Sequence, residues 1–387
     1  MHGINPMSQV RPDSIVLGAG LMGRLLALAL ARRGQRVEVH DAGVPSAEGS
    51  AARAAAAMLA PLAESAITEQ SVVRQGIHAL ARWPALLQQL PVPVFFQQQG
   101  TVIVWHRQDA AEARRFAGLI GRTAAALPEL PAPREIDGAA LGAIEPALQD
   151  RFARALHLPG EGQLDNRGLL EALRLALEAQ PKVTLHWGSA RAPEDFPPQT
   201  GGDASDGPWL FDCRGLGARA QWRTLRGVRG EVIRLHAPDV GLLRPTRLIH
   251  PRYPIYIAPK PEGLYVIGAT EIETEDLSPA SVRSTLELLS AAYTVHPAFA
   301  EGRIVEISTQ ARPTLPDNLP AVEVTGPRRL RLNGLYRHGY LIAPAVLDAV
   351  LEWVDNGRTA LAQSLGLRFE DAQAPDAGRT AAPSSTA

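Results

Sequence analysis

The chain has 387 residues, and its 39 lysines and arginines are balanced by 40 aspartates and glutamates without a basic run, which argues against nucleic acid as a partner. A single cysteine, Cys213, excludes an internal disulfide and a cysteine-based zinc site, and it fits a reducing cytoplasm. The longest apolar helical stretch, Leu21 to Ala31, is too short to cross a bilayer, so we expect a cytoplasmic protein without integral membrane association.

The first predicted elements are a strand, a glycine-rich turn and a helix. Gly18, Gly20 and Gly23 follow the apolar strand 14–17 in G-x-G-x-x-G spacing and open an apolar helix. Such a turn lets the backbone and the positive end of the helix dipole approach a pyrophosphate. Asp41 ends the next predicted strand, about 20 residues further on, where a carboxylate typically binds ribose hydroxyls. The pattern predicts a dinucleotide-binding unit without choosing between NAD and FAD.

Helices and strands alternate along the rest of the chain. Apolar residues at helical spacing predict helices over 64–90, 109–127, 168–178, 279–293 and 343–354. Apolar runs and alternation predict two strands within 95–105, and further strands over 183–187, 230–235, 253–258, 264–268 and 304–308. Residues 209–217 are predicted to form a strand that runs into a glycine turn. The order favours an α/β fold, with a doubly wound, Rossmann-like sheet interleaved with an α+β domain on a mixed or antiparallel sheet.

Five groups of residues, in order, resemble one family. They comprise 15–41, 54–61, 211–218, then 228–231 with 256–259 and 266–270, and finally 311–317 with 336–344. The last group is the most specific, because it joins Ala311-Arg-Pro-Thr-Leu-Pro-Asp317 to Tyr336-Arg-His-Gly-Tyr-Leu-Ile-Ala-Pro344. On these residues the chain resembles the FAD-dependent D-amino acid oxidase family, and most of all its glycine oxidases of thiamine biosynthesis. The resemblance implies FAD rather than NAD.

The resemblance also implies a split domain organisation. A discontinuous FAD-binding domain is expected from 14–62, 150–225 and 310–368, and a substrate domain from 63–149 and 226–309. Two segments outside these domains are predicted to be flexible tails: 1–13, which is polar, and 373–387, which is rich in alanine, proline, serine and threonine. Members of the family often assemble into homo-oligomers, so we expect one here.

The implied reaction moves a hydride from Cα of a small amino acid or amine to the flavin. It yields an imine, and O2 then becomes H2O2. The resemblance implies that Arg312 binds the substrate carboxylate through both guanidinium arms, that Tyr256 adds a phenolic hydrogen bond, and that Arg337 lies near the flavin and the substrate. The structural alternatives are a surface arginine for Arg312, a cross-strand aromatic for Tyr256 and a loop arginine for Arg337.

The resemblance assigns many small or apolar residues to the cofactor. The expected FAD-binding residues are Gly18, Gly20, Leu21, Met22, Gly23, Asp41, Ser50, Arg53, Ala54, Ala55, Ala56, Met58, Ala190, Gly215, Gly339, Tyr340 and Leu341. Met58 is expected to face the flavin or the substrate cavity. Two positions depart from the family pattern: Ala57 stands where glycine is usual, and Ala190 where valine is usual.

Glu271 is a third departure, because an apolar residue can line the cavity at this position in glycine oxidases. If it points inward, we expect it to favour a substrate with an extra amine or a polar side chain. Its alternative is a solvated strand end in the acidic run 271–276. No hydrolase or phosphate-loop motif is present, and the histidines show no ligand spacing, so we expect no metal.

Three other functions stay open at this point. A related FAD-dependent D-amino acid dehydrogenase passes electrons to quinone and shares nearly every motif. A non-catalytic flavin-binding module is possible in principle, although Arg312 and Tyr256 beside an intact dinucleotide turn argue against it. An NAD-dependent hydroxyacid dehydrogenase suits the opening turn but gives the C-terminal motifs no role.

Overall fold

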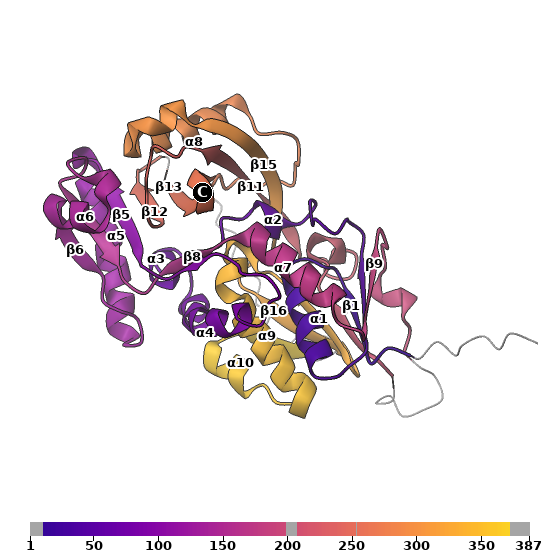
Figure 1. Cartoon of the computed structure of the whole chain (residues 1–387). Helices are drawn as coiled ribbons and strands as arrows, with labels where there is room; N and C mark the ends of the chain where they lie inside the picture. The colour runs from indigo at the N-terminus through magenta and orange to yellow at the C-terminus, as the bar shows by residue number, and fades with distance from the viewer. Residues whose placement is uncertain (1–10, 199–206, 253, 372–387) are drawn as a thin grey trace, which may run out of the picture.

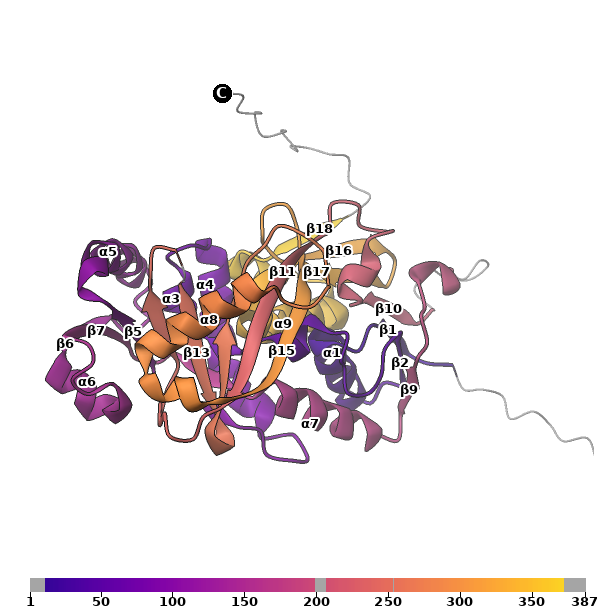
Figure 2. The same ribbon diagram turned by 90° about the horizontal axis from the view of Figure 1, so that it is seen from above.

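The computed structural model describes residues 11–198, 207–252 and 254–371, coloured along the chain in Figure 1. Two large sheets, one of seven strands and one of eight, lie side by side (Figure 2). Of the helices described, none combines the length and the apolar character that crossing a bilayer requires. The predicted flexible tails, 1–13 and 373–387, lie almost wholly outside the described residues.

The seven-stranded sheet runs in the order β18-β16-β17-β10-β1-β2-β9, and its neighbours are parallel except for the antiparallel pair β16 and β17. Val16 and Leu17 in the central strand β1 are fully buried, as expected for an apolar parallel strand covered on both faces. The strands are β1 (Ser14–Leu17), β2 (Val37–Asp41), β9 (Val183–Trp187), β10 (Trp209–Asp212), β16 (Ala321–Gly326), β17 (Arg329–Asn333) and β18 (Arg368–Asp371).

Helices pack against this sheet through apolar surfaces. The helix α1, which follows the glycine turn, lies between α7 and α9 and is buried almost all round, as its apolar sequence requires. The helix α4 packs on α9, where the Trp83 indole Nε1 donates to the Tyr340 carbonyl at 3.0 Å. These helices are α1 (Leu21–Arg32), α4 (Gln70–Leu87), α7 (Asn166–Glu178), α9 (Gly339–Asn356) and α10 (Ala360–Leu365).

The eight-stranded sheet runs in the order β15-β11-β14-β13-β12-β5-β7-β6 and is antiparallel except between β12 and β5. The helix α8 (Val282–Val295) packs against β11, β13 and β14, with Leu288 and Ala292 buried in the shared core. The strands are β5 (Thr101–Trp105), β6 (Arg134–Asp137), β7 (Arg154–Leu158), β11 (Arg226–His236), β12 (Thr246–Ile249), β13 (Ile255–Lys260), β14 (Leu264–Gly268) and β15 (Arg303–Thr314).

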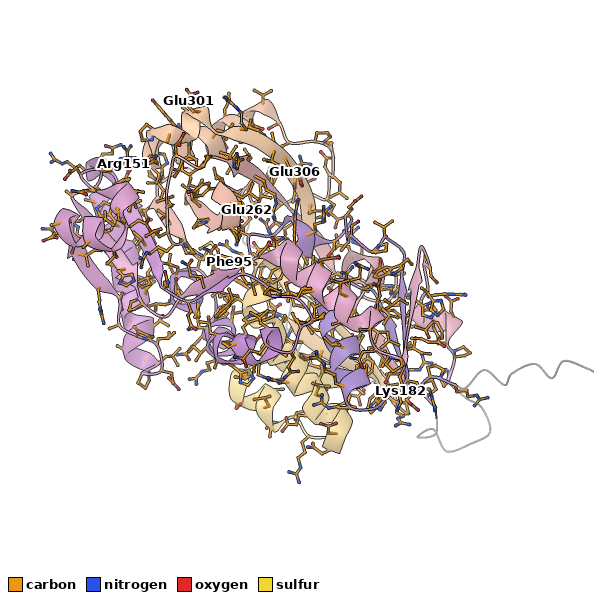
Figure 3. All side chains as sticks on the ribbon, viewed as in Figure 1. Phe95, Arg151, Lys182, Glu262, Glu301 and Glu306 are labelled. Carbon is orange, nitrogen blue, oxygen red and sulfur yellow. The ribbon has the colours of Figure 1, made fainter. Side chains whose placement is uncertain are left out.

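Short elements and ion pairs join the two sheets. Arg167 on α7 pairs with Glu306 on β15 at 2.8 Å, and Glu306 is labelled on its strand in Figure 3. A three-stranded sheet, β3-β8-β4, lies close by and carries Met58 into the space between the large sheets. The remaining elements are α2 (Ala51–Ala54), β3 (Met58–Leu59), α3 (Pro61–Glu64), β4 (Phe96–Gln97), α5 (Ala110–Ala126), α6 (Gly138–Ile144) and β8 (Gly162–Leu164).

The predicted fold class is confirmed, and β9 and β14 have the predicted bounds. Several local predictions were wrong. The helix expected over 64–90 starts only at Gln70, as α4, because α3 ends at Glu64 and the chain turns over residues 65–69. The two strands expected within 95–105 exist, but β4 pairs with β8 while β5 joins the eight-stranded sheet. The strands β3, β6, β7, β8, β12, β16, β17 and β18 were not predicted.

The expected domain bounds stay a prediction, and two elements cross them. The strand β7 lies in the segment 150–225 that was assigned to the FAD-binding domain, yet it pairs with β5 and β6 in the eight-stranded sheet. The helix α4 lies in the segment 63–149 assigned to the substrate domain, yet Leu80 and Trp83 share a core with β1 and α1. Packing therefore places both elements on the other side of the expected boundary.

Candidate active site

A cavity of about 1380 Å³ opens between the two large sheets. Its lining runs from the carboxyl ends of β1 and β2, at Gly18 and Asp41, to β11, β13 and β15 of the other sheet. Every predicted site residue lines it except Gly23 and Arg53. Residues from one end of the sequence to the other therefore meet around one space.

The glycine turn has the geometry that its sequence predicts. Gly18 has a φ of 91°, and a Cβ there would lie 2.7 Å from the Cys213 carbonyl oxygen. A Cβ on Gly23 would lie 1.8 Å from the Gly18 carbonyl oxygen, so only glycine lets α1 pack this closely on the turn. Gly23 thus acts through packing from outside the cavity.

Two helix N-termini face the cavity without a capping side chain. α1 starts after Gly20 and α9 after His338, and neither of these residues caps its helix with a side-chain hydrogen bond. Gly20 and Gly339 both line the cavity. The first N–H groups of a helix and its positive dipole end attract anions or polar oxygens. The sequence placed the start of α9 at residue 343, and the actual start at Gly339 puts predicted Gly339, Tyr340 and Leu341 in its first turn.

Asp41 organises the far end of the cavity. Its carboxylate accepts hydrogen bonds from the main-chain N–H groups of Ala19, in the glycine turn, and of Gly43, the latter at 2.7 Å. Its carbonyl accepts from the N–H of Ser189 at 2.8 Å, which places predicted Ala190 next to it at the end of β9. Asp41 is partly exposed toward the cavity, so it is available to a ligand there as well.

An alanine-rich segment forms the wall between the two ends. Ser50 caps α2 by accepting from the Ala52 N–H at 3.2 Å, and predicted Ala54, Ala55, Ala56 and Met58 line the cavity. Arg53 turns away and donates to the Ser46 carbonyl at 3.2 Å, so its predicted contact with the cofactor has no support in its position. Ala57 has a φ of 53°, a conformation that favours the glycine usual in the family pattern.

Lys260 holds this wall in place, a role that sequence reasoning did not predict. Its buried Nζ donates to the carbonyls of Ala56 at 2.8 Å and Leu164 at 2.7 Å, and to the side chain of Gln163 at 3.1 Å. Burial lowers the pKa of Lys260 to about 7. Burying a cation whose partners are all neutral acceptors costs free energy. That cost indicates that the backbone position of Ala56 is important for the shape of the cavity.

At the other end, Arg312 presents an uncompensated positive charge. Its guanidinium donates to the carbonyls of Arg229 at 3.2 Å and Thr270 at 3.1 Å, and none of the ion pairs found among the described residues includes it. Burial lowers the pKa of Arg312, which reflects the cost of a cation in this position. A Cβ on Gly230 would lie 2.3 Å from the Arg312 Cζ, so the guanidinium needs a glycine beside it.

Tyr256 lies beside Arg312 and is positioned in the same way. It pairs with Gly268 across β13 and β14, where a Cβ would lie 2.5 Å from the phenolic oxygen. Burial raises the pKa of Tyr256, so the hydroxyl keeps its proton and can donate. Sequence reasoning missed Gly230 and Gly268 as site residues, although both stand in the stretches 228–231 and 266–270 that carried the resemblance.

Arg337 is held by two carboxylates. Its Nε lies 3.2 Å from Glu64 and its Nη1 lies 2.8 Å from Glu271, whose other oxygen accepts from the Tyr336 hydroxyl. The neighbouring charge of Glu64 raises the pKa of Arg337, against the effect of burial. The guanidinium lines the cavity as predicted, but its charge is offset by these partners.

Glu64 is the centre of this network and was not predicted. Beside Arg337 it also contacts Arg247 in an ion pair and the Nε2 of buried His338 at 3.1 Å. Burial alone would raise its pKa, but Arg337 and Arg247 hold the pKa of Glu64 well below its usual range. The one available signal was a single charge directly after the apolar segment 58–63.

Three potential metal ligands come together on the edge strand β9 and its neighbour β2, outside this network. Glu38, His40 and His186 lie close enough for a shared ion, although the spacing of the histidines along the chain did not indicate a metal site. The two imidazole rings are stacked, with centroids 4.4 Å apart and planes 9° from parallel. Ring nitrogens coordinate within the ring plane, so these two lone pairs do not converge on one point. The absence of a metal therefore stays a prediction.

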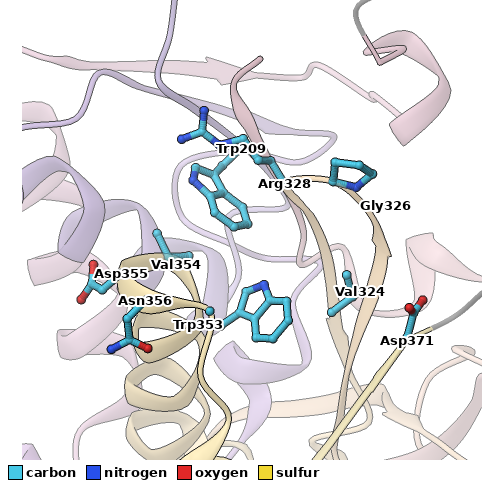
Figure 4. A pocket seen from close by; sticks show the side chains of 11 residues that line it. Trp209, Val324, Gly326, Arg328, Trp353, Val354, Asp355, Asn356 and Asp371 are labelled. Carbon is cyan, nitrogen blue, oxygen red and sulfur yellow. The ribbon is translucent and has the colours of Figure 1, made fainter. Parts of the chain in front are cut away.

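A second, smaller hollow of about 500 Å³ lies where α9 ends beside β16 (Figure 4). Trp209 and Trp353 lie on opposite sides of it, with Asp371 at its rim. It shares no lining residue with the larger cavity. The glycine turn, the two uncapped helices and Arg312 all belong to the larger cavity, which is the candidate active site.

Residues 13–353 match the family described as FAD dependent oxidoreductase, DAO. The chain belongs to this family. It is 39% identical over 338 residues to the "Putative thiamine biosynthesis oxidoreductase ThiO" of Rhizobium etli, covering 87% of this chain and 94% of the relative. It is 26% identical over 374 residues to the glycine oxidase of Geobacillus kaustophilus, covering 90% and 94%. The crystal structure of glycine oxidase from Geobacillus kaustophilus superimposes with a TM-score of 0.74 at 23% identity, covering 90% of this chain and 96% of that one.

These likenesses confirm the predicted family, the fold, the cofactor FAD and the enzyme class, an FAD-dependent amine or amino acid oxidoreductase. The cavity fits the cofactor. The Gly18 turn, which a Cβ would fill, suits the pyrophosphate, and Asp41 suits the ribose. The alanine wall and the N-terminus of α9 leave room for a flat ring system between them.

Proposed function

We propose that this enzyme oxidises glycine or another small amino acid or amine to its imine, which water converts to an oxo acid and ammonia, while O2 is reduced to H2O2. The observation that carries the proposal is Arg312, a half-buried cation in the cavity whose hydrogen bonds go to main-chain carbonyls. A buried charge without a counter-ion is costly, and a substrate carboxylate would neutralise it.

Arg312 and Tyr256 would hold the two oxygens of that carboxylate. The planar guanidinium suits a bidentate pair, and the protonated phenol of Tyr256 can donate to the same group. FAD, when bound, takes up the two electrons and the proton that leave the substrate's amine carbon. The role of Arg312 and Tyr256 is to hold that carbon in one orientation, which lowers the entropic part of the barrier.

Glu64 gives Arg337 a different role from the expected one. With carboxylates on Nε and Nη1, Arg337 does not bring a net positive charge to the ring system. We propose that it ties Glu271 and Tyr336 to the buried Glu64 and so shapes the wall near Arg312. His338, whose Nε2 is engaged by Glu64, is not proposed as a base.

The names of the relatives support a pathway role. The Rhizobium etli relative is named for thiamine biosynthesis and the Geobacillus kaustophilus relative for glycine oxidation. We propose that the imine of glycine produced here serves thiazole formation for thiamine, in the reducing cytoplasm that a single cysteine fits. A homo-oligomer, the common assembly of such oxidases, is proposed on the same basis.

The experiment that tests the reaction is anaerobic mixing of the purified holoprotein with glycine, sarcosine, D-alanine and D-proline. The flavin absorbance at about 450 nm is followed, and air is then admitted. Bleaching by glycine that air reverses, with H2O2 released, is the expected result. If the flavin absorbance recovers with a quinone dye but not with air, the enzyme is a dehydrogenase and not an oxidase. A yellow protein that none of the amines bleaches would refute the proposed substrates.

A further inference from the structure

Glu271 occupies a position inside the cavity that the proposed reaction does not explain. It follows β14 closely, and its side chain is 46% exposed and lines the cavity. Its two carboxylate oxygens accept from the Tyr336 hydroxyl at 2.5 Å and from the Arg337 Nη1 at 2.8 Å. The carboxylate is therefore fixed from two sides while it faces the ligand space.

The contacts of Arg337 show what Glu271 displaces. Its Nε is held by Glu64, which is buried and stays ionised because Arg337 and Arg247 keep the pKa of Glu64 low. The more exposed partner, on Nη1, is Glu271. Without Glu271, Arg337 would offer a cation to any anion in the cavity, as Arg312 does.

The charges around this wall cancel. Arg247 and Arg337 carry two positive charges, and Glu64 and Glu271 carry two negative ones. Removal of the Glu271 charge would leave one net positive charge there. Arg312 is close by, because its Nη2 donates to the carbonyl of Thr270, the residue before Glu271. A substrate anchored on Arg312 would thus have Glu271 near it.

We propose that Glu271 restricts the enzyme to amines with a single carboxylate. This inference rests on the proposed function, because it assumes that Arg312 anchors the substrate carboxylate. A second carboxylate on the substrate would meet the negative charge of Glu271 and find Nη1 of Arg337 already taken. Since Glu271 is already paired with Arg337, it does not act as a free anion that attracts an extra amine, which is a different role from the one the sequence suggested.

Glu271→Gln removes the charge while keeping the side-chain length and an acceptor for Tyr336. The measured quantity is kcat/KM for iminodiacetate divided by kcat/KM for glycine. We expect this ratio to rise about tenfold or more, because one like charge at close range is removed and one guanidinium charge is released. An unchanged ratio in a variant that still oxidises glycine would overturn the proposal.

Glu273→Gln is the matched control. Glu273 belongs to the same acidic segment and pairs with Arg226, but its side chain is 67% exposed and does not line the cavity. Its removal alters the net charge of the protein by the same amount, so we expect the iminodiacetate-to-glycine ratio to stay within about twofold. A similar rise in both variants would mean that general electrostatics, and not Glu271, sets the preference.

Ligand binding provides a second readout that does not depend on turnover. The melting temperatures of the holoprotein and of both variants are measured in the presence of malonate, a dicarboxylate, or acetate, a monocarboxylate. We expect malonate to raise the melting temperature of Glu271→Gln but not that of the parent, while acetate acts alike on all three. Equal malonate effects in parent and variant would contradict the proposal. If the parent oxidises no amine, the proposed reaction fails, but the malonate comparison still decides the role of Glu271.

Discussion

The two ends of the cavity are built in opposite ways. The cofactor end uses main-chain groups from one short segment, the turn between β1 and α1, and the Asp41 carboxylate accepts from the Ala19 N–H in that turn. The substrate end uses charged side chains from β12, β15 and three loops or short helices, including Glu64, Glu271 and Arg312. Main-chain geometry depends on local sequence, whereas the side-chain cluster depends on how distant strands pair. The two ends should therefore fail differently when they are changed.

The largest effect is expected at the cofactor end. Gly23→Ala would place a Cβ 1.8 Å from the Gly18 carbonyl oxygen, and both are backbone-fixed, so the turn must shift. We expect the purified variant to retain almost no bound flavin, and therefore almost no activity, and to unfold more easily. Flavin absorbance per protein and a thermal melt measure the two effects.

Gly121→Ala provides the control for that change. Gly121 also lies in a helix, α5, but no atom comes within 4 Å of the Cβ that alanine adds. Alanine should leave flavin content unchanged and stabilise the helix by up to about 1 kcal/mol. Equal flavin loss in both variants would show that the turn is not the reason.

The next effect is expected at the substrate end. Arg312→Lys keeps the charge but loses the fork that can hold both carboxylate oxygens, so kcat/KM for glycine should fall about 100-fold. Flavin content should not change, in contrast with Gly23→Ala. The exposed Arg303 lies on the same strand, and Arg303→Lys should leave kcat/KM unaltered. Loss of flavin in Arg312→Lys would contradict the assignment of cofactor binding and substrate binding to different ends of the cavity.

The same contrast explains what the sequence could predict. The turn, the following helix and Asp41 are local patterns, and each has the structure that its residues indicate. Arg312 and Tyr256 were found through the resemblance, and the cavity brings them together. Gly230 and Gly268 escaped notice because their role is to leave space for those two side chains across neighbouring strands.

Other misses have the same physical origin. Glu64 has partners at positions 247, 337 and 338, a set that no periodicity in the sequence reveals. The early start of α9 was missed because a helix start is recognised by its capping residue, and this helix begins without one. Arg53 stands in a matching stretch, yet its side chain faces away from the cavity. Segment likeness alone does not give side-chain direction.

Buried charge should also make the substrate end sensitive to pH. Glu161 is 2% exposed, and its carboxylate accepts a hydrogen bond from the Ala63 N–H, in the first turn of α3, at 2.7 Å. Burial raises the pKa of Glu161 to about 7. In the unfolded chain this carboxyl loses its proton near pH 4.5. The neutral carboxyl therefore contributes fully to the free energy of unfolding below pH 4.5, and this contribution is lost as the pH rises through about 7.

Glu161→Gln removes that dependence, because the amide keeps an acceptor for Ala63 and cannot ionise. We expect the variant to be more stable than the parent by roughly 2 to 3 kcal/mol at about pH 8 and by much less at about pH 5. Denaturant unfolding at the two pH values measures this. The exposed Glu129→Gln should show no such difference, and a gain in Glu161→Gln that is equal at both pH values would contradict the assignment.

The smallest effect is expected at Ala57, where the cofactor wall meets the substrate end. Ala57 is buried with a φ of 53°, and Ala60, also buried, has a φ of −129°. Substitution by glycine removes a buried methyl and adds chain freedom at both positions, but it relieves backbone strain only at Ala57. We therefore expect Ala57→Gly to be about 1 to 2 kcal/mol less destabilising than Ala60→Gly in denaturant unfolding. Equal losses of unfolding free energy in the two variants would mean that Ala57 adopts this conformation without backbone strain.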